Sequence, residues 1–253
     1  ASQSLKVVLS GEGADEIFGG YNVYSEPNST MYDKLPMGLR RGIGHLAQKV
    51  PAHRGVNFFV RKGKTLEERF IGNAYMFTPE DRKAILKIKT AAPDPTAITK
   101  PYYDQVQDQD DVTKMQYLDL HMWMAGDILL KADKMSMANS LELRVPFLDK
   151  EVMKLAEQIP TRYRVTRKEV TDSHTSYVTK YAMRLAAKKD TPPQTAKTAA
   201  KKKLGFPVPI RVWLKEDTYY NKVRAAFESE DAQHFFHTCL LYTSPSPRDR
   251  QKS

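Results

Sequence analysis

The sequence has little of what would place the chain in several common protein classes. It contains a single cysteine, Cys239, among 253 residues, which excludes an internal disulfide framework and a metal site built from several cysteines, and favours a reducing compartment. His45, His53, His121 and His174 are scattered without the spacing of metal ligands. No apolar run approaches the ~20 residues of a membrane-spanning helix, and no basic, then apolar leader opens the chain. We therefore expect a soluble, cytoplasmic protein with no membrane contact.

Positive charge is in excess, since 40 lysines and arginines against 30 acids give a formal charge of +10. Such an excess occurs in proteins that bind nucleic acids or membranes. Here the basic residues are mixed with acids except at 188–189, 201–203 and the C-terminal tail, and no basic-aromatic motif occurs. We therefore favour a solvated surface and expect no nucleic-acid partner. A non-catalytic basic binding module with residues 188–203 as its patch is the alternative, which a steep salt dependence of binding to random duplex DNA would support.

The length and the apolar content of 41% allow one large core or two small ones. We predict one domain over residues 1–238 and a disordered tail over 239–253, because the tail is rich in serine, proline and arginine without periodicity. The tail resembles translated adaptor sequence, and we interpret it as non-native. The chain opens at Ala1 directly before a predicted core strand, so we interpret it as a piece of a longer protein.

The stretch from Lys6 to Tyr21 combines an apolar run, an acid between two glycines and a short amphipathic segment. This order predicts a buried strand, a tight loop and a helix. Gly11 and Gly13 would allow the positive φ or close approach of an anion cradle, and the helix N-terminus would offer free N–H groups. Asp15 in the first turn would repel a bare polyphosphate, so we expect a phosphate ligand to arrive with a divalent cation. An ordinary strand–helix turn with solvated acids is the alternative.

Residues 112–138 carry apolar side chains at helical spacing and predict a buried helix or helix pair, broken at Gly126. On this stretch Asp127, Lys131 and Lys134 fall on one helix face. They form either an ordinary exposed ion pair or a site into which Asp127 points while Lys131 keeps it ionised.

Residues 141–149 alternate apolar and charged side chains before a proline, which predicts an extended segment followed by a helix over 150–158 with Asp149 as N-cap. Within it, Glu142 and Arg144 lie among apolar neighbours, and we expect a semi-buried charged network with a structural role. Further helices are predicted over 37–50, 65–70, 79–88, 177–187 and, as a pair, 217–236, while the polar stretch 22–36 is predicted to lie on the surface.

Near the C-terminus, Lys203 precedes Gly205, Pro207 and Pro209. Two prolines leave the backbone few conformations, which suits a lysine side chain that must be aimed. The neighbouring lysine Lys201 is interpreted as part of a solvated charge run.

Three blocks of the sequence, residues 10–21, 127–149 and 203–214, resemble the glutamine-dependent asparagine synthetases, and they occur in the family's order. The resemblance implies a fold that is α/β to mostly α. The chain would be part of an adenine-nucleotide α-hydrolase-like domain, of the PP-loop ATP pyrophosphatase type, with one or few parallel strands followed by a helical subdomain. It also implies a homodimer for the full-length enzyme.

The resemblance further implies a reaction. The side-chain carboxylate of aspartate attacks the α-phosphorus of ATP, with Mg²⁺ as cofactor, to give β-aspartyl-AMP and pyrophosphate. Ammonia released from glutamine then converts the adenylate to asparagine. By the same resemblance Ser10 and Gly11 would hold the AMP part, and Asp15 would bind the metal.

The catalytic residues implied by the resemblance are Glu12, Asp127 and Lys203. Lys203 would stabilise charge on the α-phosphoryl oxygens. Glu12 would assist formation of the intermediate or take a proton from ammonia, with Asp127 nearby to tune it. The three side chains should therefore face one pocket. At Lys201 relatives often have arginine, so a bidentate phosphate contact there is not expected.

Two elements of the family are missing from the sequence: the pyrophosphate loop Ser-Gly-Gly-Leu-Asp-Ser-Ser and the N-terminal glutaminase cysteine. We therefore predict that this chain alone neither hydrolyses glutamine nor forms the adenylate. Within the family, a carboxylate-adenylating enzyme of the β-lactam synthetase type is the alternative. Glu12 argues for asparagine synthesis, because the β-lactam-forming relatives tend to replace that acid.

Overall fold

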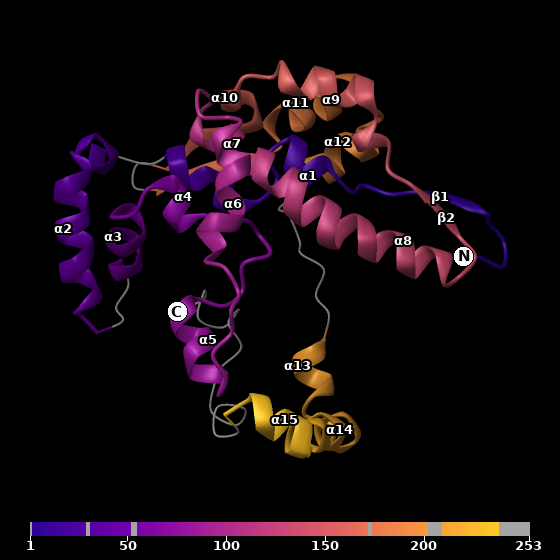
Figure 1. Cartoon of the computed structure of the whole chain (residues 1–253). Helices are drawn as coiled ribbons and strands as arrows, with labels where there is room; N and C mark the ends of the chain where they lie inside the picture. Colours follow the sequence, from indigo (N-terminus) through magenta and orange to yellow (C-terminus); the bar gives the residue numbers. More distant parts are fainter. Residues whose placement is uncertain (1, 29–30, 52–54, 172–173, 202–208, 238–253) are drawn as a thin grey trace. The chain divides into compact units, whose positions relative to one another are not determined.

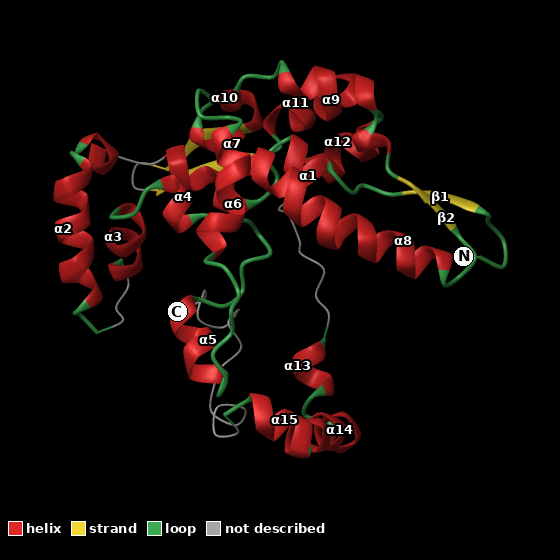
Figure 2. Ribbon diagram, in the orientation of Figure 1, coloured by secondary structure: helices red, strands yellow, loops and turns green. Residues whose placement is uncertain are grey.

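The computed structural model describes residues 2–28, 31–51, 55–171, 174–201 and 209–237. The chain divides into two compact units, the first formed by Ala1–Ala74 and Asp94–Lys201, the second by Tyr75–Pro93 and Lys202–Ser253. Helices predominate over strands in the described part, as Figure 2 shows. The coarse prediction of a mostly helical chain with few strands is confirmed.

The first unit carries both two-stranded sheets and most of the helices (Figure 1). Its strands are β1 (Val7–Leu9), β2 (Glu142–Arg144), β3 (Val165–Thr171) and β4 (His174–Thr179). Its α-helices are α1 (Ala14–Ile17), α2 (Met37–Gln48), α3 (Val56–Lys62), α4 (Leu66–Arg69), α6 (Pro95–Asp104), α7 (Asp111–Asp119), α8 (Leu129–Met137), α9 (Lys150–Glu157), α10 (Thr161–Arg164), α11 (Tyr181–Asp190) and α12 (Pro193–Ala199). The 3₁₀ segments are η1 (Asn22–Asn28), η2 (Met31–Lys34) and η4 (Pro146–Leu148), and η3 (Leu120–Ile128) is π-helical.

The strands β1 and β2 run parallel, with Val8 opposite Leu143 in the register. The strand predicted after Lys6 is therefore present, but the prediction that it is buried is wrong, since Leu9 is 73% exposed. The reason is that a two-stranded sheet leaves both outer edges open and buries only the side chains that a helix covers.

The ion pair between Glu142 and Arg144 lies on β2, with the Arg144 Nε 2.8 Å from Glu142 Oε1. Both side chains are more than half exposed, so the expected semi-buried network is wrong. The two residues are two apart on one strand and therefore point to the same face, which here is the open one.

The strands β3 and β4 form an antiparallel hairpin. The helix predicted over 177–187 is therefore wrong at its start, because Tyr177–Thr179 belong to β4 and α11 begins at Tyr181. Lys180 between them has a φ of 52°. This left-handed conformation turns the chain from strand to helix, and helical side-chain spacing alone cannot reveal it.

The long helical stretch predicted over 112–138 is confirmed as α7, η3 and α8 in succession, and its predicted interruption is the π-helical η3, which contains Gly126. Met115 and Leu118 are buried as expected, whereas Ala125, predicted on the same side, is exposed. A π-helix has wider turns than an α-helix, so the apolar face changes direction within η3.

Several helix starts follow from their caps. Thr65 and Thr78 each accept the backbone N–H three residues on and form capping boxes before α4 and α5 (Pro79–Ile85), and Asp149 accepts from Glu151 before α9. The helices predicted over 37–50, 65–70, 79–88 and 150–158 are thereby confirmed, with ends that differ by one to three residues.

The core of the first unit packs α4, α6 and α7 against η1. Tyr24, on η1, is fully buried, and its hydroxyl donates to the carboxylate of Asp119 at 2.6 Å. The prediction that 22–36 is a surface excursion is therefore wrong at Tyr24. Tyr24 lies in a stretch composed mostly of polar residues, so no periodic pattern of apolar residues marks it as buried.

The second unit contains α5, α13 (Ile210–Trp213), α14 (Asp217–Glu228) and α15 (Glu230–Phe235). The chain after α5 pairs with the end of α15 through Leu86 and Phe236. The predicted helix pair over 217–236 is confirmed, but Tyr220 and Val223 are exposed where an inward position was expected. The four helices that the structure describes in this unit offer too little surface to enclose the two side chains.

Within the ranges described above, no helix combines the length and the apolar character that crossing a membrane requires. The predicted tail over 239–253 lies outside the described residues, so its disorder and its non-native origin stay predictions. The prediction of one domain over 1–238 also stays a prediction.

Candidate functional site

The predicted anion cradle lies at the carboxyl ends of β1 and β2. The Ser10 N–H continues the ladder by donating to the Arg144 carbonyl at 2.8 Å, and the Ser10 hydroxyl accepts the Glu12 N–H at 3.4 Å. The chain then turns into α1, whose N-cap is Gly13. Parallel strands present ligand sites at this edge, so Ser10–Gly13 stands where a nucleotide site is expected.

The two glycines of the loop differ in what they require. Gly13 has a φ of 88°, and a Cβ there would come within 2.5 Å of Leu148 Cδ2. Gly11 has no positive φ, and a Cβ would meet nothing within 4 Å. Backbone conformation and packing thus explain glycine at Gly13 only, and the close approach of a ligand expected at Gly11 stays a prediction.

Asp15 lies in the first turn of α1, where the sequence places it, and forms an ion pair with Lys180 at 3.1 Å between Oδ1 and Nζ. Both side chains are about one quarter exposed. The glycine pair that ends α1 permits this contact, because a side chain at Gly20 would strike Asp15 and Lys180. The Lys180 N–H also donates to the Gly19 carbonyl at 3.3 Å. Asp15 is therefore held by a residue that lies far along the sequence.

The neighbouring acid, Glu16, is buried, and its carboxylate accepts a hydrogen bond of 2.6 Å from the Tyr21 hydroxyl. The Trp123 ring N–H donates to that hydroxyl at 3.2 Å. Burial raises the pKa of Glu16, although the Tyr21 hydrogen bond partly opposes the effect. Burial and the contact with Glu16 raise the pKa of Tyr21. Glu16 is thus a buried acid that ties α1 to the chain that follows it.

The helix α1 is fixed from behind by a buried polar chain. The Gln116 amide donates to the carbonyls of Glu16 and Ile17, and its oxygen accepts from Arg164 at 2.7 Å. Arg164 also donates to the Thr113 hydroxyl at 2.8 Å. Because α1 has only four residues, its carbonyls lack partners within the helix. The Gln116 amide donates to two of them, and Arg164 holds that amide in place.

Glu12 projects into a hollow of about 400 Å³ that is also lined by Lys131 and the apolar side chains of Leu141 and Leu143. Lys131 lies one helical turn after Asp127 on the α8 side of the stretch. Of the three residues that the sequence placed on one helix face, only Lys131 thus lies beside Glu12 in this hollow.

Asp127 is exposed and does not line this hollow. Its carboxylate makes no ion pair or hydrogen bond with Lys131 or any other residue of the described part. Asp127 is the last but one residue of η3, so the change from π to α geometry lies between the two side chains. Whether Asp127 tunes Glu12 stays a prediction.

Lys203 lies outside the described residues, so its approach to Glu12 also stays a prediction. Lys201 is described and exposed, in agreement with a solvated side chain.

Metal ligation would rest on Asp15, in the first turn of α1. Over the described ranges no group of three or more His, Cys, Asp or Glu side chains comes together to hold an ion. A Mg²⁺ ion commonly binds through one or two carboxylates plus phosphate oxygens and water. The donor set therefore fits a Mg²⁺ ion that arrives with a phosphate ligand, and does not fit a metal held by protein alone.

The sequence model of the asparagine synthase family matches residues 1–245. This span contains the loop Ser10–Gly13, the helix α8 and the lysines at 201–203. The chain belongs to the asparagine synthase family.

Individual relatives agree with this assignment. The asparagine synthetase [glutamine-hydrolyzing] 1 of Bacillus subtilis is 46% identical over 219 residues, which are 86% of this chain and 33% of the relative. Putative asparagine synthetases [glutamine-hydrolyzing] of Mycobacterium bovis and Mycobacterium tuberculosis are 42% identical over 244 residues, 96% of this chain and 36% of theirs. The chain thus spans about a third of the length of these curated relatives. No solved structure matches the chain.

The family resemblance predicted from the three sequence blocks is therefore confirmed, and neither a β-lactam-forming enzyme nor a basic binding module is favoured by the relatives. The sequence pattern did not reveal Lys180 or the Gln116–Arg164 chain, which support the loop and α1 of this candidate site. A Thr-Lys step between a β-branched run and a helical pattern is the signal that could have drawn attention to Lys180.

Proposed function

We propose that the whole protein makes asparagine from aspartate and ATP, with glutamine as nitrogen donor. The aspartate side-chain carboxylate attacks the α-phosphorus of ATP, pyrophosphate leaves, and ammonia then displaces AMP from the β-aspartyl carbon. Membership of the asparagine synthase family over residues 1–245 is the observation that carries this proposal. The relatives that support it are named as glutamine-hydrolysing enzymes.

The loop after β1 is proposed to hold the AMP part. Ser10 is fixed by its N–H bond to Arg144, and its hydroxyl is turned back onto the Glu12 N–H. Gly11 has no side chain and open space beside it, so a ligand can approach the backbone there closely. Ser10 and Gly11 would therefore bind the nucleotide through the backbone and one hydroxyl.

Asp15 is proposed to contact the magnesium that accompanies ATP. The metal would neutralise charge on the phosphates, which lowers the cost of bringing an anionic carboxylate to them. Lys180 would hold the Asp15 carboxylate in place from the other side, since the two are ion-paired. Lys180 is thus proposed as a positioning residue for Asp15.

Glu12 is proposed as the acid that assists formation of the intermediate or takes a proton from the attacking ammonia. Its position in the hollow beside Lys131 supports this role. Asp127 and Lys203 complete the proposal, the first as a residue that tunes Glu12 and the second as the charge that stabilises the α-phosphoryl oxygens.

The finer aspects of the assignment belong to the same proposal. They are a PP-loop ATP pyrophosphatase-type fold for the complete domain, Mg²⁺ as the metal, a homodimer of the full-length enzyme, and a cytoplasmic location. The absence of a membrane-spanning helix from the described part is compatible with the last of these.

The test is pyrophosphate release by the full-length protein with ATP, Mg²⁺ and ammonium, measured with and without aspartate. We expect release that depends on aspartate and produces asparagine in equal amount. A full-length protein that releases pyrophosphate equally well without aspartate would contradict the proposal. The present chain, which lacks the Ser-Gly-Gly loop, is expected to be inactive in ATP–pyrophosphate exchange.

In the full-length protein Glu12→Gln is the decisive variant. We expect it to lower the rate of asparagine formation by roughly 100-fold or more, as loss of one preorganised catalytic group does. Glu151→Gln is the matched control, because Glu151 is an exposed acid on α9 whose side chain pairs only with Lys154 in the described part. Equal activity of the two variants would remove Glu12 from the mechanism.

A further inference from the structure

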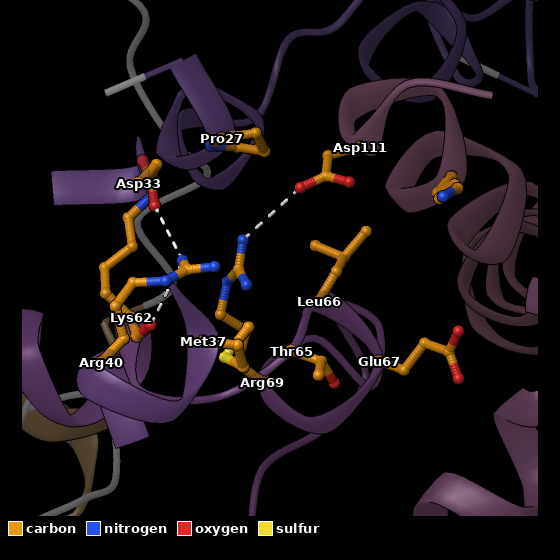
Figure 3. A pocket seen from close by; sticks show the side chains of 11 residues that line it. Pro27, Asp33, Met37, Arg40, Lys62, Thr65, Leu66, Glu67, Arg69 and Asp111 are labelled. Carbon is orange, nitrogen blue, oxygen red and sulfur yellow. Dashed lines mark hydrogen bonds and ion pairs between the residues drawn. The ribbon is translucent and has the colours of Figure 1, made fainter. Parts of the chain in front are cut away.

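A second pocket of the first unit gathers cations that the proposed reaction does not use. It has a volume of about 390 Å³ and lies between η2, α2, α4 and the start of α7. Four basic side chains line it, namely Arg40, Lys62, Arg69 and Lys114. Figure 3 shows the side chains of Arg40 and Arg69 extending into this space from different helices. None of these residues lines the hollow beside Glu12.

Three of the four cations are withdrawn from water. The exposed fractions of the Lys62, Arg69 and Arg40 side chains are 1%, 6% and 14%. Burying so much charge of one sign is costly unless anions compensate for it.

The protein's own acids are shared among these cations. Asp33 pairs with both Lys62, at 2.8 Å, and Arg40, at 3.2 Å. Glu26 pairs with both Arg69, at 3.2 Å, and the more exposed Arg61, at 2.6 Å. Each of these two carboxylates is shared between two cations, and the lining as a whole carries four basic and three acidic side chains, so positive charge is in excess along the wall of the pocket.

Asp111 reduces this excess only in part, since it lies 3.7 Å from Arg69 and its side chain is 45% exposed. Glu67, the remaining acid of the lining, is exposed on α4. Both acids are screened by water far more than the buried cations are.

Hydrogen-bond donors are left over as well. The Nε of Arg40 is buried and has no hydrogen-bond partner among the described residues. The two hydrogen bonds of the Arg40 guanidinium, to Asp33 and to the Lys62 carbonyl, both come from Nη1. The ammonium group of Lys114 forms no ion pair or hydrogen bond within the described part, and only its backbone N–H donates, to the Asp110 carbonyl at 3.0 Å. The pocket therefore offers an arginine edge and a free ammonium group to a ligand.

We propose that this pocket binds the phosphate group of a small molecule. A guanidinium presents a planar fork that matches phosphate oxygens, and a lysine adds a point charge. The Arg40 edge would make the directed hydrogen bonds, Lys114 would supply the mobile charge, and Lys62 would hold Asp33 away from the ligand. The ligand is either free phosphate or a phosphomonoester, and a volume of about 390 Å³ admits both.

The experiment is calorimetric titration of the 253-residue chain with inorganic phosphate at constant ionic strength, with chloride as the reference anion. We expect saturable binding to one site with a Kd below about 1 mM. Lys114→Gln should weaken this affinity about fivefold and Arg40→Lys about tenfold, because the first removes a charge and the second the fork. This measurement of phosphate binding does not depend on the proposed synthesis of asparagine.

Two controls keep the result specific. Lys49→Gln removes one exposed lysine that does not line the pocket, and should leave the affinity unchanged. Ser10→Ala changes the loop after β1 and should also leave it unchanged. If Arg40→Lys loses its native circular dichroism, Lys114→Gln decides alone, because the ammonium group of Lys114 has no partner to lose.

The proposal is overturned if phosphate binding is not saturable, or if Lys114→Gln and Lys49→Gln affect it equally. It is also overturned if Ser10→Ala abolishes binding while Lys114→Gln does not. A parallel titration with glycerol phosphate identifies the source of the phosphate group. A tighter Kd than that of inorganic phosphate supports a phosphorylated metabolite as occupant, and an equal one supports free phosphate.

Discussion

The sheet of β1 and β2 and the helix α7 are both rich in apolar residues, yet they differ in how they are enclosed. On α7, Met115 and Leu118 are at most 1% exposed, because η1, α4 and α6 pack around them. On β1, Val7 and Leu9 are 39% and 73% exposed. An apolar sequence therefore determines which element forms, whereas its neighbours determine whether the element is buried.

The largest effect expected from this difference concerns stability. Met115→Ala should lower the free energy of unfolding by about 2–5 kcal/mol, because it opens a cavity among enclosed neighbours. Leu9→Ala should cost less than about 1 kcal/mol, since most of that side chain already contacts water. Urea unfolding followed by circular dichroism measures both. Equal losses for the two variants would contradict the comparison.

A pH dependence sharpens the same comparison, because the enclosed region also buries Asp119. Burial raises the pKa of Asp119 to about 6, although hydrogen bonds from Tyr24 and Asn73 oppose the shift. A carboxyl group whose pKa is raised on folding contributes stability that is fully present below about pH 4 and is lost as the pH rises through about 6.

The wild-type chain should therefore gain about 2 kcal/mol relative to Asp119→Asn when the pH falls from 7 to 4. The difference between the two unfolding free energies, measured by urea titration at each pH, isolates this residue from the other titrating groups. A difference that does not change with pH would show that Asp119 titrates normally.

A smaller effect is expected in the loop Ser10–Gly13, which connects β1 to α1. Gly13→Ala should cost about 1–2 kcal/mol, because its φ of 88° is strained for alanine and the new methyl group would strike Leu148. Gly11→Ala is the matched control and should change stability by less than about 0.5 kcal/mol. Thermal unfolding compares the two. If the control is destabilised as much, the loop has a different conformation.

The smallest effect belongs to the open sheet. Arg144→Ala breaks the exposed pair with Glu142, and should lower the free energy of unfolding by less than about 1 kcal/mol. The loss should decrease further in 1 M salt, which screens exposed charges. A loss above about 2 kcal/mol in urea unfolding would indicate that β2 is covered in solution.

The sequence was most informative where local chemistry decides the structure. The caps at Thr65, Thr78 and Asp149 and the glycine turn at Gly13 were predictable, because each depends on residues within three or four positions. The loop after β1 was predictable for the same reason, whereas the roles of its residues are implied by the family resemblance and stay a proposal.

The remainder depends on contacts between distant segments. Tyr24 is buried in a cluster built by distant segments and donates to Asp119, 95 residues away, and Asp15 pairs with Lys180. The hairpin of β3 and β4 was missed although Val165–Thr171 and the following strand are rich in β-branched residues. Such contacts leave no periodic pattern in either partner, so they cannot be derived from one segment alone.

The central claim is that aspartate is adenylated, and an isotope in its side-chain carboxylate tests this most directly. The full-length protein is supplied with aspartate labelled with ¹⁸O in that carboxylate, together with ATP and ammonium, and the products are analysed by mass spectrometry. Because the carboxylate oxygen that attacks the α-phosphorus leaves with AMP, the account predicts one ¹⁸O atom in each AMP formed. Label in inorganic phosphate, or AMP without label, would contradict it.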